Sequence, residues 1–393
     1  MLPTQRLTDV FLPPILLIIG PWRIGPLQDL GPPMNAEFQT LYQELLAPGP
    51  ANWARHDRAL FLYLDSHTSV LEHDSYFNNL TPYWRILEQD NRYVDAVRLW
   101  HERISAAIRW ENSHAPRKVH KGTPLYFLGT THILAKSLER GFLAMHRALD
   151  EDARTRTSLT PNTPAYAFVT IDSTKADQYF LPWVTDLATY VESKLDEFRT
   201  VRGGTLTFAD LRSRFLANSN STLREEAFFF SSSCAKMREY ENGPIRLESE
   251  SQFGSIVELR VLFDICVILD RIIGTKVPSG IWRFVERVPF LFFSSGGRIN
   301  IRPELDDLNQ RTRNNPLGPF ISDLLDMNYM FRRNRQPTRV EADLALSYMI
   351  RNHGAHVLES LPVVHDRFSE LLSAILGSMF LAIQTLLPSD GIQ

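Results

Sequence analysis

The sequence predicts an all-α fold, in which an N-terminal array of helical hairpins precedes a C-terminal bundle of four or five helices. Apolar residues recur at spacings of three and four through much of the chain, which is the periodicity of an amphipathic helix. Breakers such as Pro48–Gly49–Pro50 fall between these segments and mark turns. From about residue 251 the apolar segments become longer, which is typical of a helical bundle.

The composition limits the number of domains and the kinds of partner. With 393 residues, the chain is too long for one ordinary core, so we expect two or three domains. Its net charge of −3 gives no overall attraction to nucleic acid, so any such site must be a local patch. Cys234 and Cys266 form neither a disulfide framework nor a zinc motif, which fits a reducing compartment and predicts a cytoplasmic protein.

Residues 1–33 are expected to be a disordered leader. The apolar stretch 11–22 contains Pro13 and Pro14, and it is shorter than the roughly 20 apolar residues that a membrane span needs. We therefore predict no membrane association. A targeting role stays open as an alternative, as does a native start at Met34, where the first well-patterned helix begins.

Residues 34–157 are predicted to form consecutive helices. Within them, residues 121–152 resemble a tetratricopeptide-type helical hairpin, because Gly129, Gly141 and Ala148 fall at that repeat's small positions. Small side chains there would let two helices approach closely. The preceding helices do not repeat the pattern at a fixed period, and a solenoid needs about three or more repeats. Stacked helices usually present a groove, so we expect a protein partner or activator at this domain.

The remainder of the chain divides into a scaffold and the bundle. Residues 158–250 have few distinctive signals and are interpreted as a helical scaffold or linker, within which 165–172 is either a short strand or a helix start. Residues 251–390 are expected to form the bundle. Its predicted helices lie at 255–274, 280–297, 315–333, 339–358 and 362–388.

A polar cluster interrupts the apolar segment 343–358. Arg351, Asn352, His353 and His356 follow a run of residues that would fill a core. Because an unpaired buried charge is costly, such a cluster is either a satisfied structural network or a site. The carboxylates that could complete a structural network are Asp264, Asp270 and Asp343.

The spacing of arginine and histidine alone does not identify a site. Arg109 and His114 have the same spacing as the cluster, and Arg140 and His146 have a spacing one residue longer. We interpret His114 as part of an exposed loop and His146 as a surface residue after an exposed turn. The cluster differs from both pairs because it follows an apolar helix within the predicted bundle.

The segment from Arg351 to His356, RNHGAH, resembles the signature of the HEPN family, named for its occurrence in higher eukaryotes and prokaryotes and for nucleotide binding. That signature is an arginine followed four to six residues later by a histidine, often as Arg-Asn-x-x-x-His, on the third long helix of a small bundle. The resemblance covers roughly residues 250–388. It implies a metal-independent endoribonuclease without a cofactor, and a homodimer in which two copies of the motif form the cleft.

The residue types in the motif suit RNA cleavage. An arginine guanidinium can hold a phosphate through two hydrogen bonds, and an imidazole can move the proton of a ribose 2′-hydroxyl. Asn352 lies four positions before His356 and can contact it on a helix. Arg351 and His356 point about 140° apart on a straight helix, which the dimer implied by the resemblance would resolve. His353 is either an additional site residue or a polar neighbour.

A basic segment precedes this helix and is the predicted RNA-binding surface. Tyr329 and Phe331 are interleaved with its arginines and could stack on bases. The alternative is a solvated connection between two helices. The four arginines are Arg332, Arg333, Arg335 and Arg339.

Two functions are therefore weighed. The first is an endoribonuclease that cleaves single-stranded RNA and is regulated, as relatives in toxin or antiviral defence systems often are. The second is a non-catalytic HEPN-like protein that binds RNA or dimerises. The sequence contains neither a P-loop nor a G-x-S-x-G elbow, so we expect neither of those chemistries.

Overall fold

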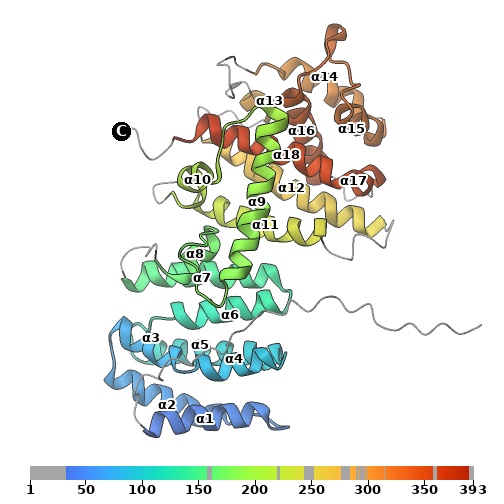
Figure 1. The fold of residues 1–393 in the computed structure, drawn as a ribbon. Helices are drawn as coiled ribbons and strands as arrows, with labels where there is room; N and C mark the ends of the chain where they lie inside the picture. Colours follow the sequence, from blue (N-terminus) through green and yellow to red (C-terminus); the bar gives the residue numbers. More distant parts are fainter. Residues whose placement is uncertain are drawn as a thin grey trace, which may run out of the picture. The chain divides into compact units, whose positions relative to one another are not determined.

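The computed structural model describes residues 32–156, 162–218, 222–242, 252–275, 284–288, 299–313, 315–356 and 361–388, with Leu291 and Gly297 (Figure 1). The regular elements in these ranges are helices, and the strand-like feature among them is an isolated bridge between Phe331 and Arg335. The predicted all-α class is therefore confirmed for the described residues. The predicted leader, residues 1–33, lies almost wholly outside them, because the first helix begins at Pro32.

The chain divides into two compact units, Met1–Val119 and His120–Gln393. A buried arginine joins two helices of the first unit: Arg103 donates to the carbonyl oxygen of His56 at 3.0 Å and to Asp57 Oδ1 at 2.9 Å. These bonds offset the cost of burying its charge. The helices of the first unit are α1 (Pro32–Leu46), α2 (Trp53–Ser66), α3 (Val70–Asn78), α4 (Thr81–Gln89) and α5 (Tyr93–Ser113).

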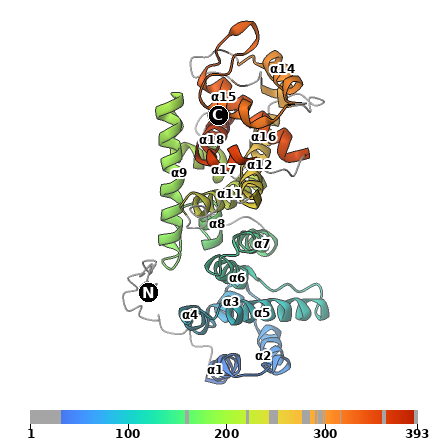
Figure 2. The ribbon, with the colours of Figure 1, turned by 90° about the vertical axis from the view of Figure 1, so that its right-hand side faces the viewer.

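The second unit contains the candidate site, and Figure 2 shows its helices from a second side. Its first part comprises α6 (Gly122–Leu134), α7 (Leu138–Arg156), α8 (Pro164–Val169), α9 (Leu181–Arg202), α10 (Phe208–Leu211) and α11 (Arg224–Asn242). The rest comprises α12 (Gln252–Gly274), α13 (Phe284–Arg287), α14 (Arg302–Thr312), α15 (Leu317–Leu325), α16 (Arg339–His356), α17 (Pro362–Asp366) and α18 (Phe368–Leu386).

The hairpin of α6 and α7 has the close contact that the small residues predict. A side chain at Gly129 would lie 3.0 Å from the carbonyl oxygen of Gly141, and one at Gly141 would overlap Ile133. Ala148 is fully buried. The two helices therefore approach closely because these positions carry no larger side chain.

We expect Gly141→Ala to destabilise the second unit by up to about 2 kcal/mol, because overpacking costs about 1–3 kcal/mol and alanine's helix propensity returns about 1. Urea denaturation of the full chain measures this change. Gly318→Ala in α15 is the matched control, since its new methyl group would meet Val363 at an ordinary 3.8 Å. Equal stability of the two variants would contradict a close contact at Gly141.

The hairpin belongs to the second unit, whereas the sequence predicted a boundary after residue 157. On α7, the ring of Phe142 lies 5.3 Å from that of Phe168 on α8 and 6.2 Å from that of Trp183 on α9. The scaffold and bundle predicted on either side of residue 250 also share one core, as the ring contact of Phe198 with Phe380 at 5.8 Å shows. Aromatic packing between segments distant in sequence thus sets the boundary at Val119.

Several predicted helices differ in their bounds. The segment 165–172 begins as α8 rather than as a strand. In the segment 315–333, α15 ends at Leu325, after which Met327 adopts a positive φ of 59°, and a short 3-10 helix begins at Arg332. The segment 362–388 breaks at Arg367 into α17 and α18. Helix α14 was not anticipated, and most of 280–297 lies outside the described residues.

Helix α18 is the central apolar helix of the second unit. By length and composition it could cross a membrane, but 78% of its most apolar 18-residue window is buried inside the structure. Among the described residues no other helix passes this test. Burial of this extent is typical of a core helix.

Candidate functional site

Helix α16 passes from the core to the surface at the polar cluster. Every residue from Glu341 to Ile350 is buried, whereas Arg351, Asn352 and His353 are partly exposed. The cluster is therefore not enclosed by the core, as a fully buried structural network would be. It lies at the C-terminal end of α16, which ends at His356.

Arg351 shares a carboxylate with a second arginine. Its Nη2 lies 3.2 Å from Asp270 Oδ2 on α12, and its Nη1 donates to Asn352 Oδ1 at 3.2 Å. Arg287 on α13 holds the other oxygen of Asp270 at 2.7 Å. Because a charge-assisted bond is typically about 2.7–2.9 Å, the contact of Arg287 is the stronger of the two. The Arg351 side chain keeps 31% of its surface exposed.

Gly354, one of the small residues that precede His356, lies where α16 packs closely against α12. A side chain at this position would come within 2.8 Å of Phe263 Cδ2 on α12. Since Arg351 meets Asp270 and Gly354 meets the earlier Phe263, α16 and α12 run in opposite directions along this contact. The close approach of these two helices therefore requires glycine and fixes where the cluster leaves the core.

The predicted site residues are brought together only in part. Arg351 and Asn352 are hydrogen-bonded to each other, and His353 lies beside them at the partly exposed end of α16. His356 is the last residue of α16, but its side chain and residues 357–360 lie outside the described residues. The expected contact of Asn352 with His356 therefore stays a prediction.

A buried carboxylate anchors the other end of α16. Asp343 is 1% exposed, forms an ion pair with Arg202 of α9, and lies 3.1 Å from Nε of Arg339. Burial raises the pKa of Asp343 to about 6 although both arginines oppose this shift. One turn further along α16, Ser347 donates to Ser378 Oγ on α18 at 3.1 Å. These contacts hold α16 against α9 and α18 and so position the cluster.

The raised pKa of Asp343 predicts a pH dependence of stability. Between about pH 4 and pH 6 the folded unit retains a proton that the unfolded chain, with a pKa of 3.8, has lost. The contribution of this carboxyl to the free energy of unfolding is thus largest below pH 4 and falls as the pH rises through 6, by about 3 kcal/mol. Urea denaturation of wild type and Asp343→Asn from pH 4 to 7 measures it. A difference that rose with pH would contradict the assignment.

The basic segment before α16 is less available to RNA than the sequence suggested. Arg335 pairs with Glu341 at 2.8 Å, and Arg339 donates to the carbonyl oxygen of Leu325 at 2.9 Å besides contacting Asp343. Arg332 and Arg333 are exposed. They lie before the N-terminal end of α16, and Arg339 and Arg351 are about 18 Å apart along the helix axis.

The interleaved aromatic residues do not form a base-stacking surface. Tyr329 and Phe331 are both buried, and their rings lie 5.9 Å apart in an edge-to-face contact. The expectation that they stack on bases is therefore wrong. Their apolar packing holds the loop against the unit.

The pairs that share the motif's spacing are explained by local contacts. His114 caps α5 and stacks on Trp110, with ring centroids 4.4 Å apart. Arg140 and His146 both lie within α7, so the expected turn between them is absent.

One imidazole–carboxylate pair was missed by the sequence analysis. Nδ1 of His365 on α17 lies 3.0 Å from Oε2 of the buried Glu258 on α12. The two residues are 107 positions apart, so no local pattern could have joined them. Among the described residues, no group of histidine, cysteine and acidic side chains could hold a metal ion.

The fold and these contacts define an all-α protein of two compact units, with a partly exposed polar cluster at the end of a buried helix of the second unit. Comparison of the chain with known protein families, with curated proteins and with solved structures found no match.

Proposed function

We propose that the second unit contains a HEPN-like bundle and is a metal-independent endoribonuclease that cleaves single-stranded RNA. In this proposal Arg351 holds the scissile phosphate and stabilises the charge that grows on its oxygens. His356 takes the proton of the ribose 2′-hydroxyl, so that the 2′-oxygen attacks phosphorus, the 5′-oxygen leaves, and a 2′,3′-cyclic phosphate remains. Asn352 orients Arg351.

The observation that carries this proposal is the change in burial along α16. Ten consecutive buried residues end at Ile350, and the next side chain is an arginine with 31% of its surface exposed. A guanidinium placed there is held by the fold and still reaches solvent. Its long contact to Asp270, a carboxylate already bound by Arg287, costs little to exchange for an RNA phosphate.

The proposal includes a homodimer through the bundle. On a straight helix, side chains five residues apart point about 140° apart, so the proposal takes Arg351 from one copy and His356 from the other. A second copy of α16 facing the first would supply the missing group. A trigger or activator bound by the helices of the first part of the chain, as in a toxin or antiviral defence effector, would control the cleft. Arg332 and Arg333 are exposed, and in this proposal they would hold RNA beyond the cleft.

The ion pair of Arg351 with Asp270 favours a second function. Arg351 has a carboxylate partner, which is what a structural network predicts. In that case the bundle is non-catalytic and serves dimerisation or RNA binding. The two functions differ in whether purified protein converts RNA into fragments ending in a cyclic phosphate.

The test is incubation of the purified full chain with a mixture of single-stranded RNAs in chelator, with and without cell extract as a source of an activator. Sedimentation of the same sample reports its oligomeric state. Fragments with 2′,3′-cyclic phosphate ends support the nuclease. RNA that stays intact in both conditions while the protein sediments as a dimer supports the non-catalytic function.

A further inference from the structure

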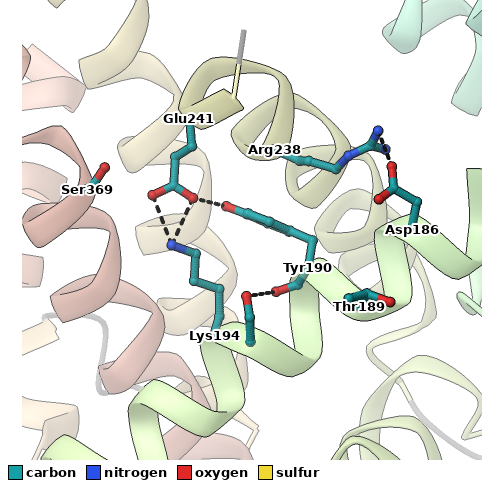
Figure 3. A pocket seen from close by; sticks show the side chains of 8 residues that line it. Asp186, Thr189, Tyr190, Lys194, Arg238, Glu241 and Ser369 are labelled. Carbon is teal, nitrogen blue, oxygen red and sulfur yellow. Dashed lines mark hydrogen bonds and ion pairs between the residues drawn. The ribbon is translucent and has the colours of Figure 1, made fainter. Parts of the chain in front are cut away.

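A polar cavity of about 490 Å³ lies between α9, α11 and the first turn of α18 (Figure 3). Ligand pockets in proteins typically measure about 300–1,000 Å³, so this cavity can hold a small molecule. It is separate from the polar cluster of α16, and the proposed nuclease does not use it. The side chains that define its chemistry are Asp186, Tyr190 and Lys194 on α9, Arg238 and Glu241 on α11, and Ser369 on α18.

Two ion pairs between α9 and α11 form the ends of the cavity. Asp186, Tyr190 and Lys194 are spaced by four residues and therefore share one face of α9. Arg238 pairs with Asp186, and Lys194 lies 2.8 and 2.9 Å from the two oxygens of Glu241. Figure 3 shows the two pairs at opposite ends, with the ring of Tyr190 between them.

The inner end of the cavity presents a hydrogen-bond donor of Lys194. Both oxygens of Glu241 are engaged, since Tyr190 Oη donates to one at 2.7 Å and Lys194 contacts each. Burial and the neighbouring Glu241 raise the pKa of Tyr190, so its phenol keeps the proton that it donates to Glu241. An ammonium group has three N–H donors, and two contacts to Glu241 leave the third for a ligand. Lys194 is only 14% exposed, which strengthens a bond to a bound carboxylate.

The outer end presents an acceptor. Asp186 is 57% exposed, and the contact of Arg238 occupies only its Oδ2. Its other oxygen therefore faces solvent at the entrance and can accept from an ammonium group. Between the two ends, the hydroxyls of Thr189 and Ser193 donate to backbone carbonyls of α9 and keep lone pairs for a ligand.

The charges of the side chains that line the cavity sum to zero, and Lys194 and Asp186 both keep hydrogen-bonding capacity for a ligand. Lys194 and Arg238 offset Asp186 and Glu241, so the cavity as a whole favours neither a net anion nor a net cation. A ligand that carries both charges loses least on entry. We propose that this cavity binds a small zwitterion, with its carboxylate at Lys194 and its ammonium group at Asp186.

The spacing of the two ends selects among zwitterions. Eight residues separate Asp186 from Lys194, which places their Cα atoms about 12 Å apart along α9. The two charges of an α-amino acid are too close together to reach both side chains. A short chain with an amine at one end and a carboxylate at the other, such as an ω-amino acid or a dipeptide, spans the cavity.

The test is calorimetric titration of the full chain with 6-aminohexanoate and with alanyl-alanine, against hexanoate and hexylammonium at equal ionic strength. We expect at least one of the two zwitterions to bind at least tenfold more tightly than either singly charged probe. Lys194→Met should weaken its binding at least tenfold, and Asp186→Asn should weaken it while leaving binding of hexanoate unchanged. Arg311→Met, which removes an exposed ion pair of α14, is the matched control and should bind as wild type does.

Two outcomes overturn the proposal. Equal binding of hexanoate and the zwitterions would make the cavity a plain anion site at Lys194. Failure of both zwitterions to bind wild type more tightly than Lys194→Met would exclude the cavity as their site. Because Asp186 is exposed, Asp186→Asn should keep the fold, and a thermal melt of each variant checks this, so weaker binding cannot be mistaken for unfolding.

Discussion

Replacing Arg202 with methionine is expected to lower the free energy of unfolding of the second unit by about 3–5 kcal/mol at pH 7.5. Arg202 is 2% exposed and pairs with Asp343, which is equally enclosed. The variant removes one cation and leaves a carboxylate that is costly to keep charged inside the core. Gly377 of α18 leaves room for the Arg202 guanidinium, because a side chain at position 377 would overlap it.

Hydrogen exchange of α16 and urea denaturation of the full chain both report this loss. Arg271→Met is the matched control: its ion pair with Glu226 is exposed, so the change should cost less than about 1 kcal/mol. At pH 5 the loss at Arg202 should shrink, because Asp343, with its pKa of about 6, then carries a proton. The double variant Arg202→Met/Asp343→Leu should recover most of the stability, since an apolar pair leaves no buried charge. If the double variant were no more stable than Arg202→Met, the pair would not be the cause.

The sequence could predict contacts that are local and could not predict those that join distant segments. The approach of α6 and α7 follows from Gly129 and Gly141 because the two helices are adjacent in the chain and both contact positions are small. The ion pair of Arg202 with Asp343 joins residues 141 positions apart, and nothing in either segment identifies the partner. The division of the chain at Val119 could not be predicted for the same reason, since ring contacts between α7, α8 and α9 join segments that no local pattern connects.

In the candidate site too, the sequence could predict the local pattern but not the contacts between distant segments. The polar cluster was found because it breaks an apolar helix, which is a local pattern. Its partner was one of three carboxylates that the sequence left open, and the structure places Asp270 against Arg351 across 81 positions. The role of Gly354 also needed the structure, because the residue that excludes a side chain there is Phe263 of another helix. The base-stacking expectation failed because exposure of Tyr329 and Phe331 depends on tertiary packing.

His356→Ala is expected to reduce RNA cleavage by about 10²–10⁴-fold, because it removes the proposed general base. Arg351→Ala should reduce it by about 10²–10³-fold through loss of charge stabilisation at the phosphate. Cleavage of a fluorescent single-stranded RNA in chelator, with activator if one is required, measures both. His114→Ala is the matched control, since it has the same spacing from an arginine but caps α5 of the first unit.

The variant Asp270→Asn distinguishes a catalytic role of Arg351 from a purely structural one. If Arg351 serves only the ion pair, neither Asp270→Asn nor Arg351→Ala should reduce RNA cleavage. If Arg351 contacts RNA, Asp270→Asn should keep cleavage within a few fold of wild type, while Arg351→Ala reduces it by about 10²–10³-fold. The contact of Arg351 with Asp270 is partly exposed and 3.2 Å long, so Arg351→Ala should cost no more than about 1 kcal/mol of stability. Asp270→Asn also removes the 2.7 Å ion pair with Arg287 and should cost more.

Mixing the two inactive variants tests the dimer. A cleft that takes Arg351 from one copy and His356 from the other is intact once in each heterodimer of Arg351→Ala with His356→Ala. Unfolding and refolding an equal mixture should therefore restore part of the activity, whereas each variant refolded alone should stay inactive. Activity that did not return, in a sample shown by sedimentation to contain dimers, would place both groups in one subunit. That result would overturn the expectation, taken from straight-helix geometry, that residues five apart need a second copy to reach one phosphate.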